Sequence, residues 1–404
     1  MEDTQSKSDQ NTLNNSSQQQ QQEEVKNETS AQKLTKPLKL STEEFRSRSQ
    51  ACILSAFIGD AAGGVLEFQH NFSPRQIEKA IKLPGGGVFG LGEGQITDDS
   101  EMAMCLFQAL SNGYGKMNLD DMAGMYKQWV DSNPFDIGIT TRKALYGGDG
   151  RASTIFQKVQ QFNASSQSNG SLMRITPLAV WASKLSNEDL YKAVHLQTYF
   201  THCNKAVIEA TYLYCLVIKL ILNGETDRVK IYNDIKKEAG QLDMEEVLQW
   251  FNQLELEGPP VATINAGWAK IAFLYTFHYL RNPDVYPKDD LNKILKDILS
   301  QEGDTDTNAA IVLGVMGAFN KREELNQDQV TKLLAYQCVK NDDRKTNNGI
   351  QRPDFLIPGK VLTEEAFNDF FKMMPTKLEV VYEKRLLNQT GVDELCYEYL
   401  VPKF

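Results

Sequence analysis

Apolar residues recur at helical spacing through most of the chain, beginning near residue 41. Ser41 and Glu44 have the spacing of a helix capping box, and the helical period continues after them at Phe45, Ser49, Cys52, Ile53, Ala56 and Phe57. The same criteria predict further helices over Asp98–Leu110, Ser186–Phe200, Asn204–Leu222, Gly267–Leu280 and Thr305–Phe319. Alternating strand patterns are scarce, and no βαβ unit with a glycine-rich turn is visible. The pattern therefore predicts an all-α fold.

The two ends of the chain depart from this pattern. Residues 1–40 are polar and include a glutamine run, so they lack the apolar side chains that would offset the entropy of ordering. We expect a disordered tail there and one compact domain over 41–340. Residues 341–404 are expected to form a helical extension that packs on this domain.

Composition and charge narrow the classes of function. A chain of 404 residues can bury a large core, and its net charge of −10 argues against a nucleic-acid partner, which would need a clustered basic face. The apolar run 206–222 contains Glu209 and Lys219 and is short for a membrane span, so we interpret it as a buried core helix. The six cysteines form no C-x-x-C pair, and no secretory signal is recognised. We expect a monomer with reduced thiols in the cytoplasm or nucleus, away from membranes.

Thr97, Asp98 and Asp99 form the first cluster with the chemistry of a site. Two adjacent carboxylates cannot both be buried and ionised without a counter-charge, and a divalent cation supplies far more of it than a helix N-terminus does. Three oxygen-bearing side chains in one turn suit a hard cation such as Mg²⁺. The alternative is a surface helix cap in which the extra acid complements the helix dipole.

Asp304, Asp306 and Thr307 form a second cluster, again at the start of a predicted helix. This helix is rich in alanine and glycine, so we expect it to lie deep against its neighbours, where acids are hard to explain as solvated caps. An EF-hand is excluded because the glycine at loop position six and the closing glutamate are missing. A structural cap is the alternative here as well.

Three further segments carry candidate site residues. Asn169, Gly170 and Ser171 form a turn before an apolar helical run, where backbone N–H groups can hold a phosphate, or else an ordinary loop–helix junction. His202 stands just before a predicted buried helix, where a capping or core histidine is the alternative. Glu67 lies between two apolar residues after a glycine-rich segment. If buried, its carboxyl would have a raised pKa that suits proton transfer; otherwise it is a surface glutamate.

Five motifs, taken together in chain order, resemble those of the ADP-ribosylglycohydrolase family. They are G-D-A-A-G-G-V-L-E-F, T-D-D-S, N-G-S-L-M-R, T-H-C and G-D-T-D-T-N-A, which begin at Gly59, Thr97, Asn169, Thr201 and Gly303. The resemblance covers roughly residues 50–320 and includes the segment 134–141, P-F-D-I-G-I-T-T. It implies a compact orthogonal helical bundle that uses two Mg²⁺ ions, or Mn²⁺ in some branches, to remove ADP-ribose from a protein or a small acceptor.

The resemblance also implies a role for each matching residue. Those that match the family's metal ligands are Thr97, Asp98, Asp99, Asp304, Asp306 and Thr307. Those that match positions around bound ADP-ribose are Asp60, Asn169, Gly170, Ser171 and His202. The candidate catalytic residues are Glu67, Asp98 and Asp306. The leaving group stays open between arginine, serine and small acceptors, because the first motif is similar to that of more than one branch.

Two other functions compete with this hypothesis. A non-catalytic ADP-ribose-binding relative would keep the fold, and release of free ADP-ribose in a Mg²⁺-dependent assay would separate it from an enzyme. The terpene synthases, another all-α class with two metals, need an aspartate-rich D-D-x-x-D/E motif. Met102 stands where the last acid of that motif would be.

Overall fold

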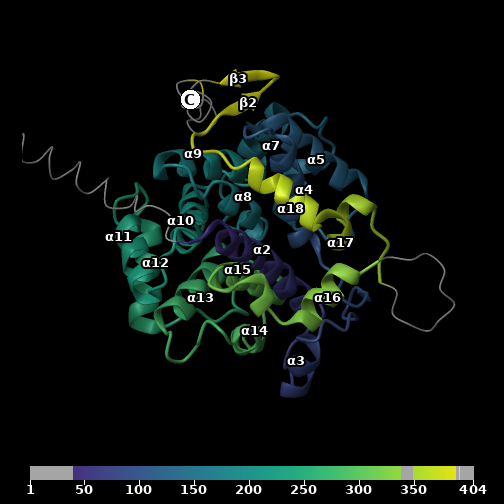
Figure 1. Cartoon of the computed structure of the whole chain (residues 1–404), viewed down its shortest axis with the longest axis vertical. Coiled ribbons are helices and arrows are strands. Elements are labelled where there is room, and N and C mark those ends of the chain that lie inside the picture. Colours follow the sequence, from purple (N-terminus) through teal and green to yellow (C-terminus); the bar gives the residue numbers. More distant parts are fainter. Residues whose placement is uncertain (1–39, 338–348, 388–390, 392–404) are drawn as a thin grey trace, which may run out of the picture.

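The structure is a computed structural model that describes residues 40–337, 349–387 and 391. The disordered tail expected over residues 1–40 lies outside this range except for its last residue. Helices make up most of the described chain, and strands are confined to one small sheet (Figure 1). The predicted all-α class is therefore confirmed.

The helices follow one another without a repeat along the described chain. The α-helices are α2 (Thr42–Gly63), α3 (Pro74–Ala80), α4 (Asp98–Asn112), α5 (Leu119–Asp131), α6 (Ile139–Leu145), α7 (Ala152–Phe162), α8 (Thr176–Trp181), α9 (Asn187–Thr198), α10 (Lys205–Leu222), α11 (Arg228–Ala239), α12 (Glu245–Glu257), α13 (Ala269–Arg281), α14 (Leu291–Ser300), α15 (Thr305–Gly317), α16 (Gln327–Ala335), α17 (Pro358–Val361) and α18 (Glu364–Lys372). The short 3₁₀ turns are η1 (Asn169–Ser171), η2 (Arg322–Glu324) and η3 (Asp354–Leu356).

Two predicted helices begin at the capping residues expected from the sequence, Ser41 and Ser186, and a third begins at Asn204, where its start was predicted. The Ser41 side chain accepts a hydrogen bond of 3.1 Å from the backbone N–H of Glu44 at the start of α2. Ser186 caps α9 and Asn204 caps α10 in the same way, each by accepting from backbone N–H groups in the first turn. These caps satisfy donors that have no partner within the helix, so the local sequence defines where each helix begins.

Helices α2 and α15 form the centre of the fold and run antiparallel (Figure 1). A Cβ atom added at Gly59 would lie 2.5 Å from the carbonyl oxygen of Ala309, and one added at Gly63 would lie 2.3 Å from the Cα of Asp306. Only glycine permits so close an approach of two backbones. As a result, the end of α2 lies directly against the start of α15.

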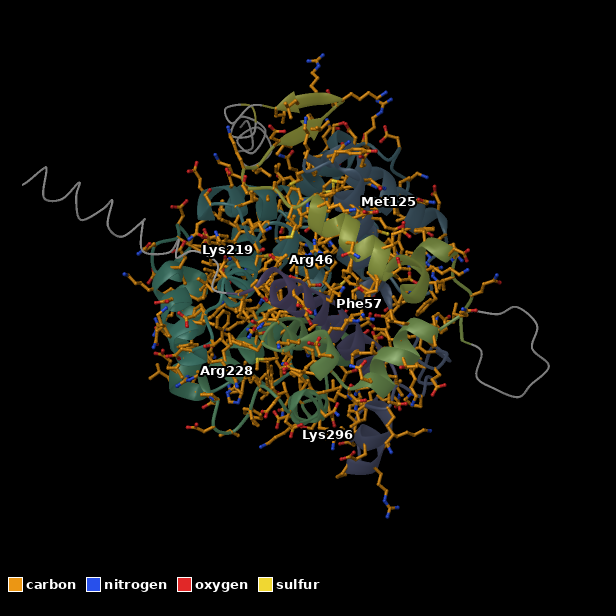
Figure 2. The ribbon with its side chains drawn as sticks, viewed as in Figure 1. Arg46, Phe57, Met125, Lys219, Arg228 and Lys296 are labelled. Carbon is orange, nitrogen blue, oxygen red and sulfur yellow. The ribbon has the colours of Figure 1, made fainter. Side chains whose placement is uncertain are left out.

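The apolar run predicted to be a core helix is α10, and it is buried along nearly its whole length. The ammonium group of Lys219, which is labelled in Figure 2, donates a hydrogen bond of 2.6 Å to the carbonyl oxygen of Leu185. Phe57 of α2, only 1% exposed, lies among the central side chains. Within the described ranges, no helix is both long and apolar enough to cross a membrane.

The described part of the C-terminal segment packs on the helical domain through α18 and a small sheet. The Phe370 ring of α18 stacks on Phe107 of α4, with ring centroids 4.5 Å apart. Strand β2 (Val380–Tyr382) pairs in parallel with β1 (Met117–Asn118) and antiparallel with β3 (Arg385–Leu387). The segment therefore joins the domain through side-chain packing and backbone hydrogen bonds.

The contact between the two central helices can be tested with a matched pair of glycine substitutions. Gly59→Ala is expected to lower the free energy of unfolding by about 1–3 kcal/mol, because the new methyl group forces α2 away from α15. Gly124→Ala in α5 is the control, since a Cβ there meets no atom within 4 Å. The control should raise stability by about 1 kcal/mol through helix propensity. Urea denaturation measures both values, and equal effects would show that the central contact relaxes freely.

Candidate active site

The two acidic clusters predicted from the sequence meet at one place in the fold. The start of α4 lies beside the start of α15, so that Thr97 Oγ1 donates to Asp306 Oδ2 at 3.3 Å. In the same contact, Thr307 Oγ1 donates to Asp99 Oδ1 at 3.2 Å. All four of these residues are buried. The alternative of two separate surface caps is therefore wrong.

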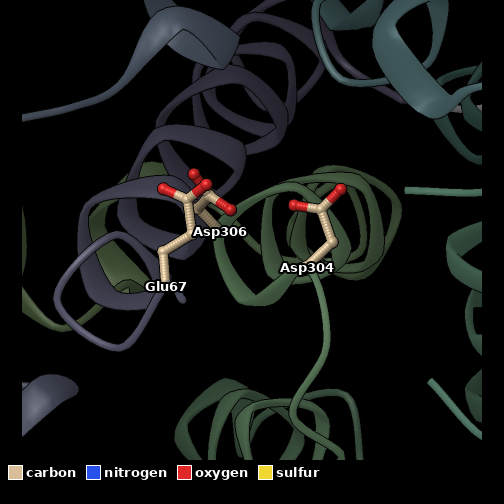
Figure 3. A group of neighbouring side chains, drawn as sticks. All are labelled: Glu67, Asp304 and Asp306. Carbon is tan, nitrogen blue, oxygen red and sulfur yellow. The ribbon is translucent and has the colours of Figure 1, made fainter. Parts of the chain in front are cut away.

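Glu67 joins this group because it follows α2, whose end is held against α15. One carboxylate oxygen each of Glu67, Asp304 and Asp306 lies within 4.8 Å of the others, an arrangement that could hold a metal ion. Figure 3 shows the Glu67 and Asp306 carboxylates close together, with Asp304 beside them at the start of α15. Glu67 is only 7% exposed, so it is not the surface glutamate considered as an alternative.

Asp60 holds the start of α4 in place. Its Oδ1 accepts from the backbone N–H of Thr97 at 2.9 Å and from Thr97 Oγ1 at 2.8 Å, while its Oδ2 accepts from the Ser100 N–H at 3.1 Å. Thr97 makes no side-chain cap of its own, so a carboxylate from α2 caps α4 instead. Asp60 is fully buried. These hydrogen bonds favour a positioning role, and the substrate contact implied by its motif stays a prediction.

Asp136 belongs to the same acidic cluster, although it is not among the site residues predicted from the sequence. It lies in the loop between α5 and α6, near enough to Asp98 for the two carboxyl groups to shift each other's pKa. The available signal was its place in P-F-D-I-G, an acid between two bulky apolar residues in a segment that resembles the family. Its loop position gave no periodic pattern from which a contact with α4 could be inferred.

Burial and mutual repulsion raise the pKa values of the clustered carboxyl groups. Burial, followed by repulsion from Asp136, raises the pKa of Glu67 to about 8. Burial is also the largest cause that raises the pKa values of Asp98, Asp99 and Asp306 well above their usual range, and neighbouring acids add to it. Two helix N-termini offset only part of this cost. The cluster therefore favours protons or cations as bound counter-charges.

The hydrogen bonds of the cluster are incomplete in a way that fits a bound cation. Three buried carboxylate oxygens have no hydrogen-bond partner: Glu67 Oε2, Asp99 Oδ2 and Asp306 Oδ1. Leaving a buried anionic oxygen without a partner is costly, so each is expected to meet a ligand. Carboxylate and hydroxyl oxygens are the donors that Mg²⁺ and Mn²⁺ prefer. The residues present thus fit a hard divalent cation.

The predicted phosphate-binding turn borders this acidic cluster. Asn169 and Ser171 lie in η1, and Asn169 Nδ2 donates to Asp304 Oδ2 at 2.7 Å. Ser171 Oγ is hydrogen-bonded to Thr211 Oγ1 of α10 at 3.1 Å, which fixes the turn from behind. The structure therefore brings the turn and the second acidic cluster together, as their motifs implied.

His202 supports the turn as a neutral side chain. Its Nε2 is 2.7 Å from Ser168 Oγ and its Nδ1 is 2.7 Å from Thr201 Oγ1, so both ring nitrogens have partners. Burial, and then repulsion from Arg174, lowers the pKa of His202 to about 3. A Cβ added at Gly170 would lie 3.3 Å from the histidine ring. His202 thus packs against the turn and shapes it, and a direct contact with ligand stays a prediction.

The domain is helical and holds a buried cluster of acids between two helix starts, an arrangement that could bind a metal ion. The sequence profile of the ADP-ribosylglycohydrolase family matches residues 41–352. The chain therefore belongs to the ADP-ribosylglycohydrolase family. This confirms the resemblance noted in the sequence and, with it, the predicted class of enzyme.

Individual relatives agree with this assignment. The chain is 28% identical over 309 residues to a protein of Acanthamoeba polyphaga mimivirus named for ADP-ribosyl glycohydrolase activity, covering 68% of this chain and 87% of the viral one. It is 31% identical over 192 residues to an ADP-ribosylarginine hydrolase of Pseudomonas putida, covering 46% of this chain and 49% of that protein. It is 30% identical over 158 residues to the ADP-ribosyl-dinitrogen-reductase glycohydrolase of Rhodospirillum rubrum, covering 38% and 51%. The alignments thus span about half the length of these two bacterial relatives.

A solved structure supports the fold independently. It is described as an ADP-ribosylglycohydrolase-related protein complex and matches with a TM-score of 0.59 at 19% identity. The match covers 82% of this chain and 99% of the other. At this level of identity the likeness concerns the fold alone.

The role of Asp306 can be tested by comparing metal-free and Mg²⁺-loaded protein. Asp306→Asn is expected to raise the metal-free Tm at pH 8, because a neutral amide avoids the cost of burying a crowded carboxyl group that must either ionise or take up a proton. The same change should weaken Mg²⁺ binding by more than about 100-fold, since it removes a ligand atom rather than an outer contact. Thermal denaturation in EDTA and across a Mg²⁺ titration measures both effects. Asp131→Asn, which alters an exposed acid, is the control. Severe unfolding in both conditions would mark Asp306 as a structural cap.

The raised pKa values predict how the metal-free protein responds to pH. Glu67 has a folded pKa of about 8 against an ordinary value of 4.5, so the folded state holds a proton that the unfolded chain has released. The free energy of unfolding should therefore fall as pH rises from about 6.5 to 8 in EDTA. The buried His195 and His202 oppose this trend near pH 6.5, where the unfolded chain still binds protons at its imidazoles, and their opposition fades as pH rises toward 8. Urea denaturation measures the slope, and saturating Mg²⁺ should abolish it. A rise in metal-free stability over this window would contradict the account.

Proposed function

We propose that this chain is a metal-dependent hydrolase that releases ADP-ribose from modified arginine side chains of proteins. The observation that carries the proposal is the convergence of both acidic clusters with Glu67 and Asp136, beside the Asn169–Ser171 turn. Family membership supports the reaction class. The named activity of the Pseudomonas putida relative supports the arginine linkage.

Two Mg²⁺ ions, with Mn²⁺ as the substitute, are the proposed cofactors. The residues that would hold them are the carboxylates and hydroxyls at the starts of α4 and α15: Thr97, Asp98, Asp99, Asp304, Asp306 and Thr307. When bound, such ions supply positive charge that orients the ribose hydroxyls and lowers the pKa of a water molecule. The unpartnered oxygens of Asp99 and Asp306 are the best support for this assignment.

The ADP-ribose would lie across the boundary between the acidic cluster and the neutral turn. The backbone of Gly170 and Ser171 would receive the pyrophosphate, because N–H groups at the start of a helical turn favour an anion. His202 would act by holding the turn in shape, since both of its ring nitrogens are already paired. Asn169 would bind ribose or orient Asp304, to which it already donates.

Glu67 and Asp136 would serve the leaving-group side of the reaction. Glu67, with a pKa near neutral, is suited to give or take a proton as the bond at the anomeric carbon breaks. An arginine leaving group carries a positive charge. Asp136, which is not a proposed metal ligand, places a further carboxylate in the cluster, where it could face that charge. Charge complementarity therefore favours a guanidinium over the neutral oxygen of a serine linkage. Asp98 would link the two halves of the site, because it is a proposed metal ligand whose carboxyl group lies close to that of Asp136.

The expected setting of the reaction follows from the same features. The proposed partner is an ADP-ribosylated protein, recognised through its modified side chain. We propose that the protein acts as a monomer in the cytoplasm or nucleus, where the four cysteines that are free among the described residues would stay reduced. The competing non-catalytic function is not favoured, because each of the motif acids is present and buried or half-buried at the site.

A direct assay tests the reaction and its linkage. The protein is incubated with arginine-, serine- and acetyl-linked ADP-ribose, with Mg²⁺ or with EDTA, and free ADP-ribose is measured. Release from the arginine linkage alone, lost in EDTA, is expected. Asp136→Asn should lower kcat by about 100-fold, since it removes a proton-transfer or charge partner of the leaving group. Asp131→Asn, five residues away on the surface, should leave kcat unchanged. Equal release from serine would overturn the linkage, and no release from any substrate would identify a binding protein.

A further inference from the structure

Arg352 is paired with Glu101 of α4, and every N–H group of its guanidinium donates a hydrogen bond. Nε and Nη2 donate to the two carboxylate oxygens of Glu101 at 2.6 and 2.9 Å. Nη2 also donates to Ser132 Oγ at 2.8 Å, and Nη1 donates to the carbonyl oxygens of Ser132 and Asn133 at 3.1 and 3.2 Å. Arg352 is only 6% exposed. A buried arginine with five satisfied donors is a fixed point of the structure.

We propose that Arg352 is a positioning residue that sets Asp136 against Asp98 and so tunes the enzyme for its leaving group. This inference rests on the proposed function. Arg352 does not touch the reacting atoms in this account, because its donors are consumed by Glu101 and by the loop. It acts through the place it gives to Asp136.

The loop that carries Asp136 depends on Arg352 for its shape. This loop joins the end of α5 to the start of α6, and Asn133 within it has a φ of +56°, a conformation that L-residues rarely adopt. Arg352 binds the carbonyl oxygens on both sides of that strained step and lies 5.9 Å from the centre of the Phe135 ring. Asp136 is the next residue, so the position of its carboxylate follows from these contacts.

Through its pairing with Glu101, Arg352 is also attached to α4, the helix that carries Asp98 and Asp99. Glu101 lies in the first turn of α4, two residues after Asp99. Its carboxylate also accepts a hydrogen bond of 2.8 Å from Trp129 Nε1. The backbone beside Arg352 is anchored as well, since Ile350 exchanges two hydrogen bonds of 2.9 Å with the Gln95 side chain. Arg352 thus connects the start of α4, which carries Asp98, to the loop that carries Asp136. In this way it sets how far apart these two acids lie.

The fork of the guanidinium is essential to this role. Lysine would keep the positive charge beside Glu101, but it has only three donors and no planar fork. It could not pair with both carboxylate oxygens and also bind two successive backbone carbonyls. Arg352→Lys should therefore keep the charge balance and release the loop.

The experiment compares Arg352→Lys with the same change at a matched site. Arg228, labelled in Figure 2, is 5% exposed and donates to the backbone carbonyls of Tyr279 and Tyr286, neither of which belongs to the acidic cluster. With Mg²⁺ and arginine-linked ADP-ribose, Arg352→Lys should lower kcat by about 10- to 100-fold, since a small misplacement of a reacting group has an effect of this size. KM should change by less than about threefold, because binding of ADP-ribose is left intact. Arg228→Lys should lower the Tm to a similar extent and leave kcat unchanged.

A double-mutant cycle with Asp136→Asn distinguishes positioning from a general structural role. If Arg352 acts through Asp136, Arg352→Lys should change kcat by less than about twofold once Asp136 is already replaced. Multiplicative losses in the double variant would overturn the inference. If Arg352→Lys does not fold, the paired change Glu101→Met with Arg352→Met removes both buried charges and replaces it in the cycle. Absence of release by the wild-type protein would instead overturn the proposed function, so the two failures are distinct.

Discussion

The organisation of this protein depends on the burial of several carboxylates at one junction of helices. Such groups repel each other and lose hydration, so the fold must hold them together against their own electrostatics. It does so by close contact of α2 with α15, where glycines bring the two backbones together. Asp60 then ties α4 to the same point. Helix packing thus holds the repelling carboxylates together, and this arrangement favours the binding of a cation.

The acids near this junction divide into two kinds according to their partners. Glu101 has its charge matched by Arg352 and a third hydrogen bond from Trp129, so it stabilises structure. Asp99 and Asp306 retain buried oxygens without partners, although they are close by in sequence or space. Glu101 and Asp99 are equally buried in the same helix turn, but only Glu101 has all of its oxygens hydrogen-bonded. The hydrogen-bond partners therefore distinguish a structural acid from a candidate ligand, whereas burial does not.

The site also has a polarity that suits an ADP-ribosylated substrate. On one side, the turn at Asn169–Ser171 rests on a neutral His202 and a buried Arg174, an environment that tolerates an anionic pyrophosphate. Glu67 and Asp136 add buried carboxyl groups to the acidic cluster, which under the proposed function would favour a cationic leaving group.

The sequence by itself determined the all-α class, the capping residues that begin α2 and α9, and the two acidic motifs, because these features are local and periodic. It did not determine which acids meet, since that depends on how closely two distant helices approach. Asp136 and Arg352 lie in segments without periodic pattern, so only the tertiary structure could assign them a place beside α4. Only the tertiary structure, likewise, shows that Asp60 of α2 caps the start of α4. Hydrophobic period specifies elements, whereas the position of a buried charge is decided by the partners that packing brings to it.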